Sequence, residues 1–198
     1  MTARHWTIVI AGLLTALTGA VSQQLSADKD PETGAFGPAQ AAADVLREVA
    51  GTDGAFLAAA LLKSNFDPNN LATLLQYPDN EIAVVAITGA KVRQAFERSI
   101  SLYPQPNSSF LQISGFEVTF DPKAAPGSRV VSVTANGLKL DDAATYKIAM
   151  PSSLGRGGLG YFKIWDKPDI VSSLPNMTVE SALKGKKVTE TRPRWVSQ

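Results

Sequence analysis

The chain has 198 residues, of which 44% are hydrophobic and 19% are charged, a composition typical of a globular protein and not of a disordered one. Its 19 basic and 18 acidic residues nearly cancel, which excludes a general electrostatic attraction to nucleic acid or to an anionic membrane. It contains no cysteine, so a disulfide framework is excluded and an ordinary hydrophobic core must stabilise the fold.

The first residues carry the features of an export signal. Arg4 provides a short positive region, Trp6–Val21 is an apolar run, and Ala20-Val21-Ser22 offers small residues for cleavage. We therefore predict a signal peptide over residues 1–22 and a periplasmic or secreted protein. An uncleaved N-terminal anchor is the alternative, and it would be the only membrane contact.

The mature chain is predicted to form one domain. Residues 23–37 are mostly polar and indicate a flexible leader. Pro38 suits the first turn of a helix, and we expect that helix over residues 39–50, ended by Gly51. Its apolar stripe comprises Ala42, Val45, Leu46 and Val49. About 175 residues suffice for a single core, so the domain is expected over residues 38–198.

The next elements alternate between strand and helix patterns. Residues 55–62 form a nearly continuous apolar run, which predicts a buried strand. Asp67-Pro68 has the pattern of a helix start, with the helix running to Leu75. A second strand is expected over residues 82–87, followed by a helix capped by Thr88. That helix carries its apolar side chains at helical spacing: Val92, Ala95, Phe96 and Ile100.

The second half reads as a meandering sheet. Apolar and polar residues alternate over 116–120, and strands follow over 130–134 and 146–150. Asn136-Gly137 predicts a tight turn because both residues tolerate positive φ. The last of these strands leads into a glycine loop, residues 155–161. The whole pattern predicts an α+β fold with a mixed sheet and packed helices.

The C-terminal part predicts one short helix and a polar tail. Thr178 is placed to cap a helix over residues 179–183, which Gly185 ends. Trp195 is the one large apolar residue of the tail. Two interpretations remain open, a docking anchor and a frayed end.

Four segments together resemble the C-terminal domain of the 5'-nucleotidase family, over about residues 40–165. They are LATLLQYPDNEIAVVAITGAKVRQAFE, FLQISGFEVTFD, GSRVVSVTANGLKLDDAATYKIAM and a Gly-Gly-x-Gly-Tyr loop. This resemblance implies the α+β fold of that domain and a role related to nucleotide catabolism by hydrolases. It also implies a nucleotide-like small molecule as the ligand.

The resemblance implies a ligand site at positions that this chain keeps only in part. Lys63 stands where the family has a phosphate-binding arginine, and a solvated lysine is the alternative. Tyr77 matches a base-stacking aromatic and Asn80 the asparagine after it, or both belong to a simple turn. Ser153 and Leu159 replace a second stacking aromatic and an aspartate. The implied ligand-binding residues are Tyr77, Asn80, Lys63, Arg156, Gly157, Gly158 and Tyr161.

Catalysis by this chain alone is not expected. The family's two-metal site lies in a separate N-terminal domain, for which there is no room before Gln40, and His5 is the only histidine. We therefore expect no catalytic residue, no bound metal and no cofactor. The leading hypothesis is a non-catalytic domain that binds a nucleotide-like ligand weakly. The alternatives are an interaction protein that reuses the fold, and the specificity subunit of a split metallophosphatase.

Overall fold

The computed structural model describes residues 30–198, so the predicted signal peptide lies outside the described residues. Its larger sheet has five strands in the order β3-β1-β7-β2-β8. Only β1 and β7 are parallel, and the other neighbours are antiparallel. The strands are β1 (Gly54–Ala58), β2 (Glu81–Thr88), β3 (Leu111–Ser114), β7 (Thr145–Pro151) and β8 (Ile170–Thr178).

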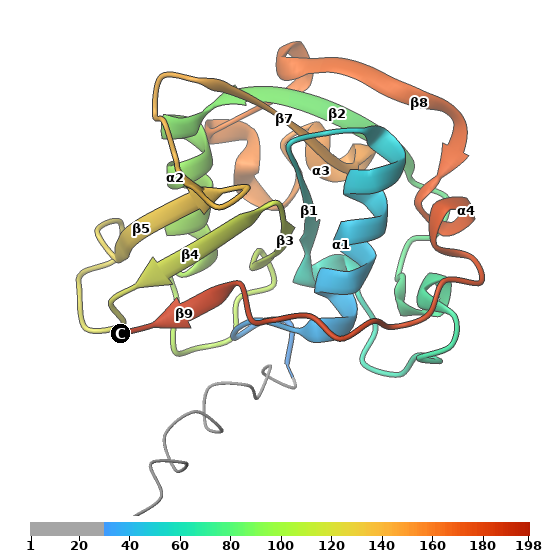
Figure 1. Cartoon of the computed structure of the whole chain (residues 1–198), viewed down its shortest axis with the longest axis horizontal. Coiled ribbons are helices and arrows are strands. Elements are labelled where there is room, and N and C mark those ends of the chain that lie inside the picture. The colour runs from blue at the N-terminus through green and yellow to red at the C-terminus, as the bar shows by residue number, and fades with distance from the viewer. Residues whose placement is uncertain (1–29) are drawn as a thin grey trace, which may run out of the picture.

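A smaller four-stranded sheet, in the order β6-β5-β4-β9, packs against this one (Figure 1). The chain after β8 crosses the molecule to place its last strand parallel to β4 at the edge of the small sheet. The strands are β4 (Phe116–Phe120), β5 (Val130–Ala135), β6 (Leu138–Lys139) and β9 (Trp195–Ser197). The mixed α+β fold expected from the sequence is thus confirmed.

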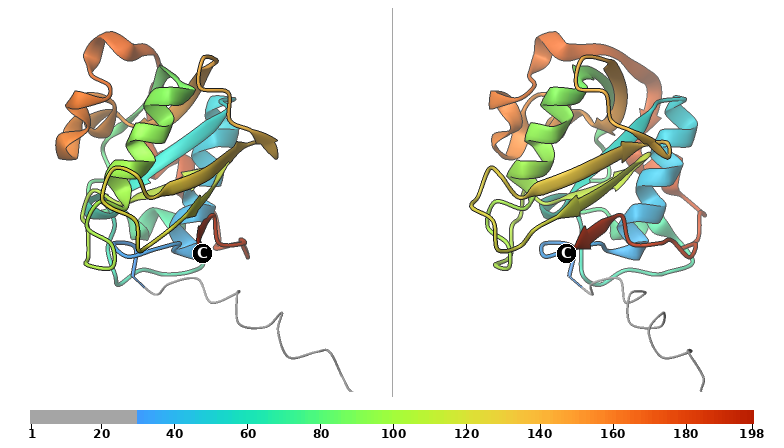
Figure 2. Two further views of the ribbon diagram at one scale, coloured as in Figure 1. Left: turned by 90° about the vertical axis from the view of Figure 1, so that its left-hand side faces the viewer. Right: turned by 60° about the vertical axis from the view of Figure 1, so that its left-hand side comes forward.

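Helices and the small sheet cover both faces of the large sheet, as the turned views also show (Figure 2). On one face, α1 (Gly37–Ala50) packs on β1 and β3, and α4 (Val179–Leu183) packs beside α1, so that both helices bury apolar side chains in one core cluster. On the other face, α2 (Gly89–Ser99) and the small sheet enclose an aromatic core. Its buried aromatic side chains are Phe56, Phe96, Phe110, Phe116, Phe120, Tyr161, Trp165 and Trp195.

Local sequence signals place several of these elements correctly. Strand β4 buries every second residue, as its alternation predicts. Asn136 and Gly137 have φ values of 51° and 82° in the turn that joins β5 to β6. The Thr88 hydroxyl accepts a hydrogen bond from Lys91 N at the start of α2, and Thr178 caps α4 in the same way.

Two predictions between β1 and β2 were wrong. Strand β1 ends at Ala58 and not at Leu62, because the chain turns into a 3-10 helix (η1, Ala59–Leu61). The helix expected from Asp67 is a turn followed by a second 3-10 helix (η2, Leu71–Leu74). The Asp67 side chain accepts from Asn69 N, two residues on, and thereby stabilises the turn.

Both ends of the described chain are hydrogen bonded to β3. The Gln112 amide donates to the carbonyls of Pro31 and Gly34 and accepts from Phe36 N, within the segment expected to be a leader. Trp195 is 5% exposed and its indole N–H donates to Leu111 O at 2.9 Å, which favours the docking anchor over the frayed end. Among the described residues, no helix is both long and apolar enough to cross a membrane.

Three shorter elements follow β7, and the first two of them build one wall of the site described next. They are α3 (Ser152–Gly155), η3 (Gly158–Lys163) and η4 (Lys167–Asp169). The glycine loop joins α3 to η3. Strand β7 lies at the centre of the large sheet, so it fixes where this loop begins.

Candidate functional site

A pocket of about 310 Å³ lies between the turn that precedes β2 and the loop that follows β7. Its lining residues are Leu61, Tyr77, Asn80, Ser153, Leu154, Gly158 and Leu159. The structure thus brings three of the predicted site residues together, Tyr77, Asn80 and Gly158. It adds Ser153 and Leu159, the two loop positions at which the chain departs from the family pattern.

Asn80 joins the two sides of this pocket. Its side-chain oxygen accepts from Ser153 N at 3.2 Å, and its amide group donates to Tyr77 O at 3.3 Å. Its own carbonyl accepts from Val179 N, which attaches the turn to α4. The predicted ligand-binding asparagine therefore holds the pocket together, and one amide hydrogen remains for a ligand.

The wall of the pocket is mostly apolar. Leu61 and Leu154 of the lining are buried, whereas Tyr77 is 57% exposed. An exposed aromatic ring over a leucine floor suits a flat, weakly polar ring, because stacking and burial of apolar area both favour it. At about 310 Å³, the pocket is at the small end of ligand sites.

Arg156 lies in an adjoining open hollow of about 540 Å³, which shares Tyr77 and Asn80 with the pocket. Two carboxylate residues, Asp79 and Glu81, line the same hollow. One cation facing two anions gives no net attraction for a phosphate group. The hollow therefore differs from a site in which unpaired arginines hold a phosphate group.

Lys63 lies apart from the Tyr77 pocket. It lines another hollow of about 420 Å³, together with Asn70, Glu180 and Lys184. Its backbone N–H donates to Leu74 O, which closes the loop between η1 and η2. The predicted lysine and the predicted stacking ring line no common pocket.

Gly157 and Gly158 of the loop are needed for close packing. Gly157 has φ of 79°, and a Cβ there would lie 2.6 Å from the Phe162 Cα. A Cβ on Gly158 would lie 2.6 Å from Ser153 O. Both distances are far below van der Waals contact, so the loop closes on itself only with glycine at these positions.

Tyr161 does not reach the pocket, because it is fully buried. Its hydroxyl donates to Ser109 O at 2.7 Å and lies 3.3 Å from Ser99 Oγ, while its ring stacks on Trp165. Burial raises the pKa of Tyr161, although the Ser99 hydrogen bond and the Arg98 charge act in the opposite direction. Its predicted role as a ligand residue is therefore replaced by a role in the core.

Arg98 was not predicted from the sequence as a residue of this region. Its guanidinium donates to Leu159 O and, at 3.4 Å, to Ser109 Oγ, and it lies 5.2 Å from the centre of the Tyr161 ring. It thus supports the loop from beneath, where Leu159 has an unusual φ of 56°.

No group of three or more His, Cys, Asp or Glu residues in the described part of the chain is arranged to hold a metal ion. The site therefore consists of one exposed aromatic ring, an apolar floor and a few neutral polar groups. Such a set of groups can bind and orient a small ring.

A family model and the similar curated proteins point to one family. A family model described as the C-terminal domain of 5'-nucleotidase matches residues 15–166. Snake venom 5'-nucleotidase from Naja atra is 36% identical over 89 residues, 41% of this chain and 17% of the relative. Human 5'-nucleotidase is 32% identical over 108 residues, 50% of this chain and 18% of the relative. The chain spans less than a fifth of the length of these two curated relatives.

Solved structures show the same fold. The 5'-nucleotidase precursor from Thermus thermophilus superposes with a TM-score of 0.70 and 21% identity, over 87% of this chain and 38% of that chain. The NAD nucleotidase of Haemophilus influenzae superposes with a TM-score of 0.64 and 17% identity, over 81% of this chain and 33% of that chain.

Proposed function

Because the chain belongs to the 5'-nucleotidase C-terminal domain family, we propose that it binds the ring portion of a nucleotide-like ligand and does not itself catalyse hydrolysis. The observation that carries this proposal is the exposed Tyr77 ring above an apolar pocket, at the position where the family resemblance implies base stacking. Nucleotide catabolism is the setting that the family suggests.

The proposed binding is weak and depends on the ring. Only one aromatic wall is present, since Ser153 occupies the place of the second, and one stacked base contributes about 1–3 kcal/mol. Asn80 and Ser153 can add one or two hydrogen bonds. Dissociation constants on the order of micromolar to millimolar follow from such a small set of contacts.

The ligand's phosphate is proposed to add little affinity. Arg156 is balanced by Asp79 and Glu81, and Lys63 lines a different hollow. Adenosine is therefore expected to bind about as tightly as AMP. This distinguishes the proposal from a phosphate-clamping site, in which AMP would bind far more tightly.

Calorimetric titration with adenosine, AMP and a UDP-sugar tests the proposal. Tyr77→Ala should weaken adenosine binding by about tenfold or more, because it removes the stacking surface. The matched control is Phe162→Ala, which removes another exposed aromatic ring that does not line the pocket. If nothing binds at millimolar ligand, or if Tyr77→Ala has no effect, the proposal fails and the interaction-protein alternative takes its place.

The absence of catalysis is proposed from the sequence. His5 is the only histidine and there is no cysteine, so residues 23–198 lack two common metal ligands. We propose that any hydrolysis requires a metallophosphatase partner. Phosphate release from AMP should stay at the buffer level with or without added Mn²⁺ or Zn²⁺, and metal-dependent release by the purified chain would refute this.

Export to the periplasm or the medium is a further part of the proposal, and it rests on the N-terminal sequence pattern. Cleavage is expected near Gln23. N-terminal sequencing of exported material decides the matter, since an intact Met1 or Thr2 terminus in a membrane fraction would favour an anchor.

A further inference from the structure

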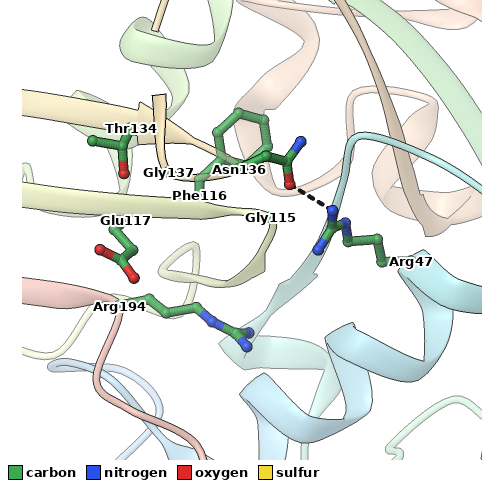
Figure 3. Close-up of a pocket in the computed structure, with 8 residues that line it drawn as sticks. All are labelled: Arg47, Gly115, Phe116, Glu117, Thr134, Asn136, Gly137 and Arg194. Atoms are coloured by element: carbon green, nitrogen blue, oxygen red, sulfur yellow. Dashed lines mark hydrogen bonds between the residues drawn. The ribbon is translucent and has the colours of Figure 1, made fainter. Parts of the chain in front are cut away.

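A separate hollow, of about 170 Å³, lies where the last turn of α1 meets the turn between β5 and β6 and the C-terminal segment (Figure 3). Its lining residues are Arg47, Gly115, Phe116, Glu117, Thr134, Asn136, Gly137 and Arg194. None of these residues lines the Tyr77 pocket. The feature that distinguishes this hollow is a pair of arginines that reach it from α1 and from the C-terminal segment.

Arg47 carries a charge with no carboxylate partner among residues 30–198. Its Nη2 donates to Asn136 Oδ1 and its Nε to Thr52 O, and both of these acceptors are neutral. Its Nη1 has no acceptor in the described part of the chain. A half-buried guanidinium held in place by neutral groups keeps both its charge and free donors for an incoming anion.

Arg194 forms a rigid second wall. Its guanidinium donates to Asp44 Oδ2 at 2.7 Å, to Ile113 O at 2.6 Å and to Gln40 O at 3.3 Å, and its side chain is only 18% exposed. Asp44 neutralises much of its charge. Because it is already fixed, little side-chain entropy would be lost when a ligand binds.

The charges around the hollow leave an excess of one positive charge. Glu117 is the carboxylate on its lining, and it is paired with Arg192 at 3.0 Å. Arg194 is paired with Asp44. Each of these two pairs has no net charge, so the positive charge of Arg47 remains. The Thr134 hydroxyl and the Asn136 amide add neutral polar groups to the lining.

We propose that this hollow is a binding site for a small oxyanion, a carboxylate or phosphate group, with Arg47 as the principal contact and Arg194 as the supporting wall. The guanidinium fork matches the two oxygens of such a group. A hollow of about 170 Å³ is too small for a whole nucleotide and suits a single acid group. This site is independent of the ring site proposed above.

Titration of ¹⁵N-labelled protein with sodium phosphate and with sodium acetate, at constant ionic strength, tests the proposal. We expect saturable shifts of the Asn136 side-chain amide and of the Gly115 and Gly137 backbone amides, with midpoints on the order of millimolar. Phosphate binding tighter than acetate would assign the site to phosphate groups, and the reverse order to carboxylates. Tyr77→Ala should leave these shifts unchanged.

Arg47→Gln should weaken binding by about tenfold or more, since charged hydrogen bonds contribute most of the affinity. The matched control is Lys123→Gln, which removes the same charge at an exposed position outside the hollow. Arg47→Lys keeps the charge but loses the planar pair of N–H donors, so about tenfold weaker binding is expected for this variant as well. It replaces Arg47→Gln in the test if the glutamine variant does not fold. Shifts that stay linear in anion concentration, or equal weakening by Arg47→Gln and Lys123→Gln, would overturn the proposal.

Discussion

The Tyr161→Phe substitution separates the two roles that the glycine-loop tyrosine can have. If the tyrosine belongs to the core, removal of its hydroxyl should reduce the stability of the protein and leave ligand binding unchanged. If it belonged to the ligand site, the reverse would hold. The structure places the side chain in the core, with no exposed surface.

The expected loss of stability follows from the two hydrogen bonds of the Tyr161 hydroxyl. It donates to Ser109 O at 2.7 Å and lies 3.3 Å from Ser99 Oγ, while Ser99 Oγ accepts from Leu111 N. Removal of the hydroxyl leaves a buried carbonyl without its donor and a serine hydroxyl without its acceptor. Leaving a buried polar group unpaired costs about 1–3 kcal/mol. Two groups are affected, and Ser99 Oγ keeps its bond from Leu111 N, so we take the low end of this range for each and expect a total loss of about 2–3 kcal/mol.

Urea unfolding followed by tryptophan fluorescence measures this loss, since Trp165 stacks on the Tyr161 ring. For a domain of this size the expected change also corresponds to a fall in Tm of about 4–12 °C. Tyr146→Phe is the matched control, because its hydroxyl accepts one hydrogen bond near the surface and should cost about 1 kcal/mol or less. A Tyr161→Phe variant as stable as the wild type, or one that loses adenosine binding while remaining stable, would refute the reasoning.

Three further predictions follow from the same geometry. Burial raises the pKa of Tyr161, so this tyrosine loses its proton at a lower pH in the unfolded chain than in the folded one. The free energy of unfolding of the wild type should therefore fall relative to that of Tyr161→Phe above about pH 10, by up to about 1.4 kcal/mol per pH unit. Urea unfolding of both proteins at about pH 9 and about pH 11 measures the difference. Trp195→Ala should lower the free energy of unfolding, measured by urea denaturation, by about 3–5 kcal/mol. Val196→Ala, on the exposed side of β9, should change it by about 0.5 kcal/mol or less. Gly157→Ala should lower Tm well beyond Gly127→Ala, since both glycines have positive φ but only the first would place a Cβ against Phe162; equal effects would show that the contact is not limiting.

Elements with a local cause could be predicted from the sequence. The Thr88 cap, the buried face of α2 and the Asn136-Gly137 turn each depend on residues within a few positions of one another. Strand β4 could be predicted from its alternation, because one of its faces packs on the core and the other does not.

Features set by distant contacts could not be predicted in this way. The apolar run after β1 continues to Leu62, but the strand stops at Ala58, since a fully apolar run carries no period that distinguishes strand from turn. Arg98 contacts Leu159, 61 positions further along the chain, so its place on one helix gave no sign of the contact. Tyr161 is buried for the same reason, as its partners come from α2 and from the loop before β3.

The glycine loop shows why a matched motif and a matched function can separate. This chain keeps four residues of the family pattern in the loop, and each has an internal structural task. Gly157, Gly158 and Gly160 allow close packing, and Tyr161 forms hydrogen bonds in the core. The two positions that differ, Ser153 and Leu159, are among those that line the pocket.

A loop that must close on itself preserves glycine and the buried tyrosine whether or not a ligand is bound. The match within this loop therefore reports the fold, and fold alone does not determine function. Ring binding by this pocket must therefore rest on the opposite wall, where Tyr77 is exposed and no second aromatic ring lines the pocket. A substitution that restores an aromatic ring there, Ser153→Phe, should strengthen adenosine binding if Tyr77 stacks a base, by up to about tenfold for one added stacking contact. If Ser153→Phe folds normally and gains nothing while Tyr77→Ala also changes nothing, base stacking is not a function of this pocket.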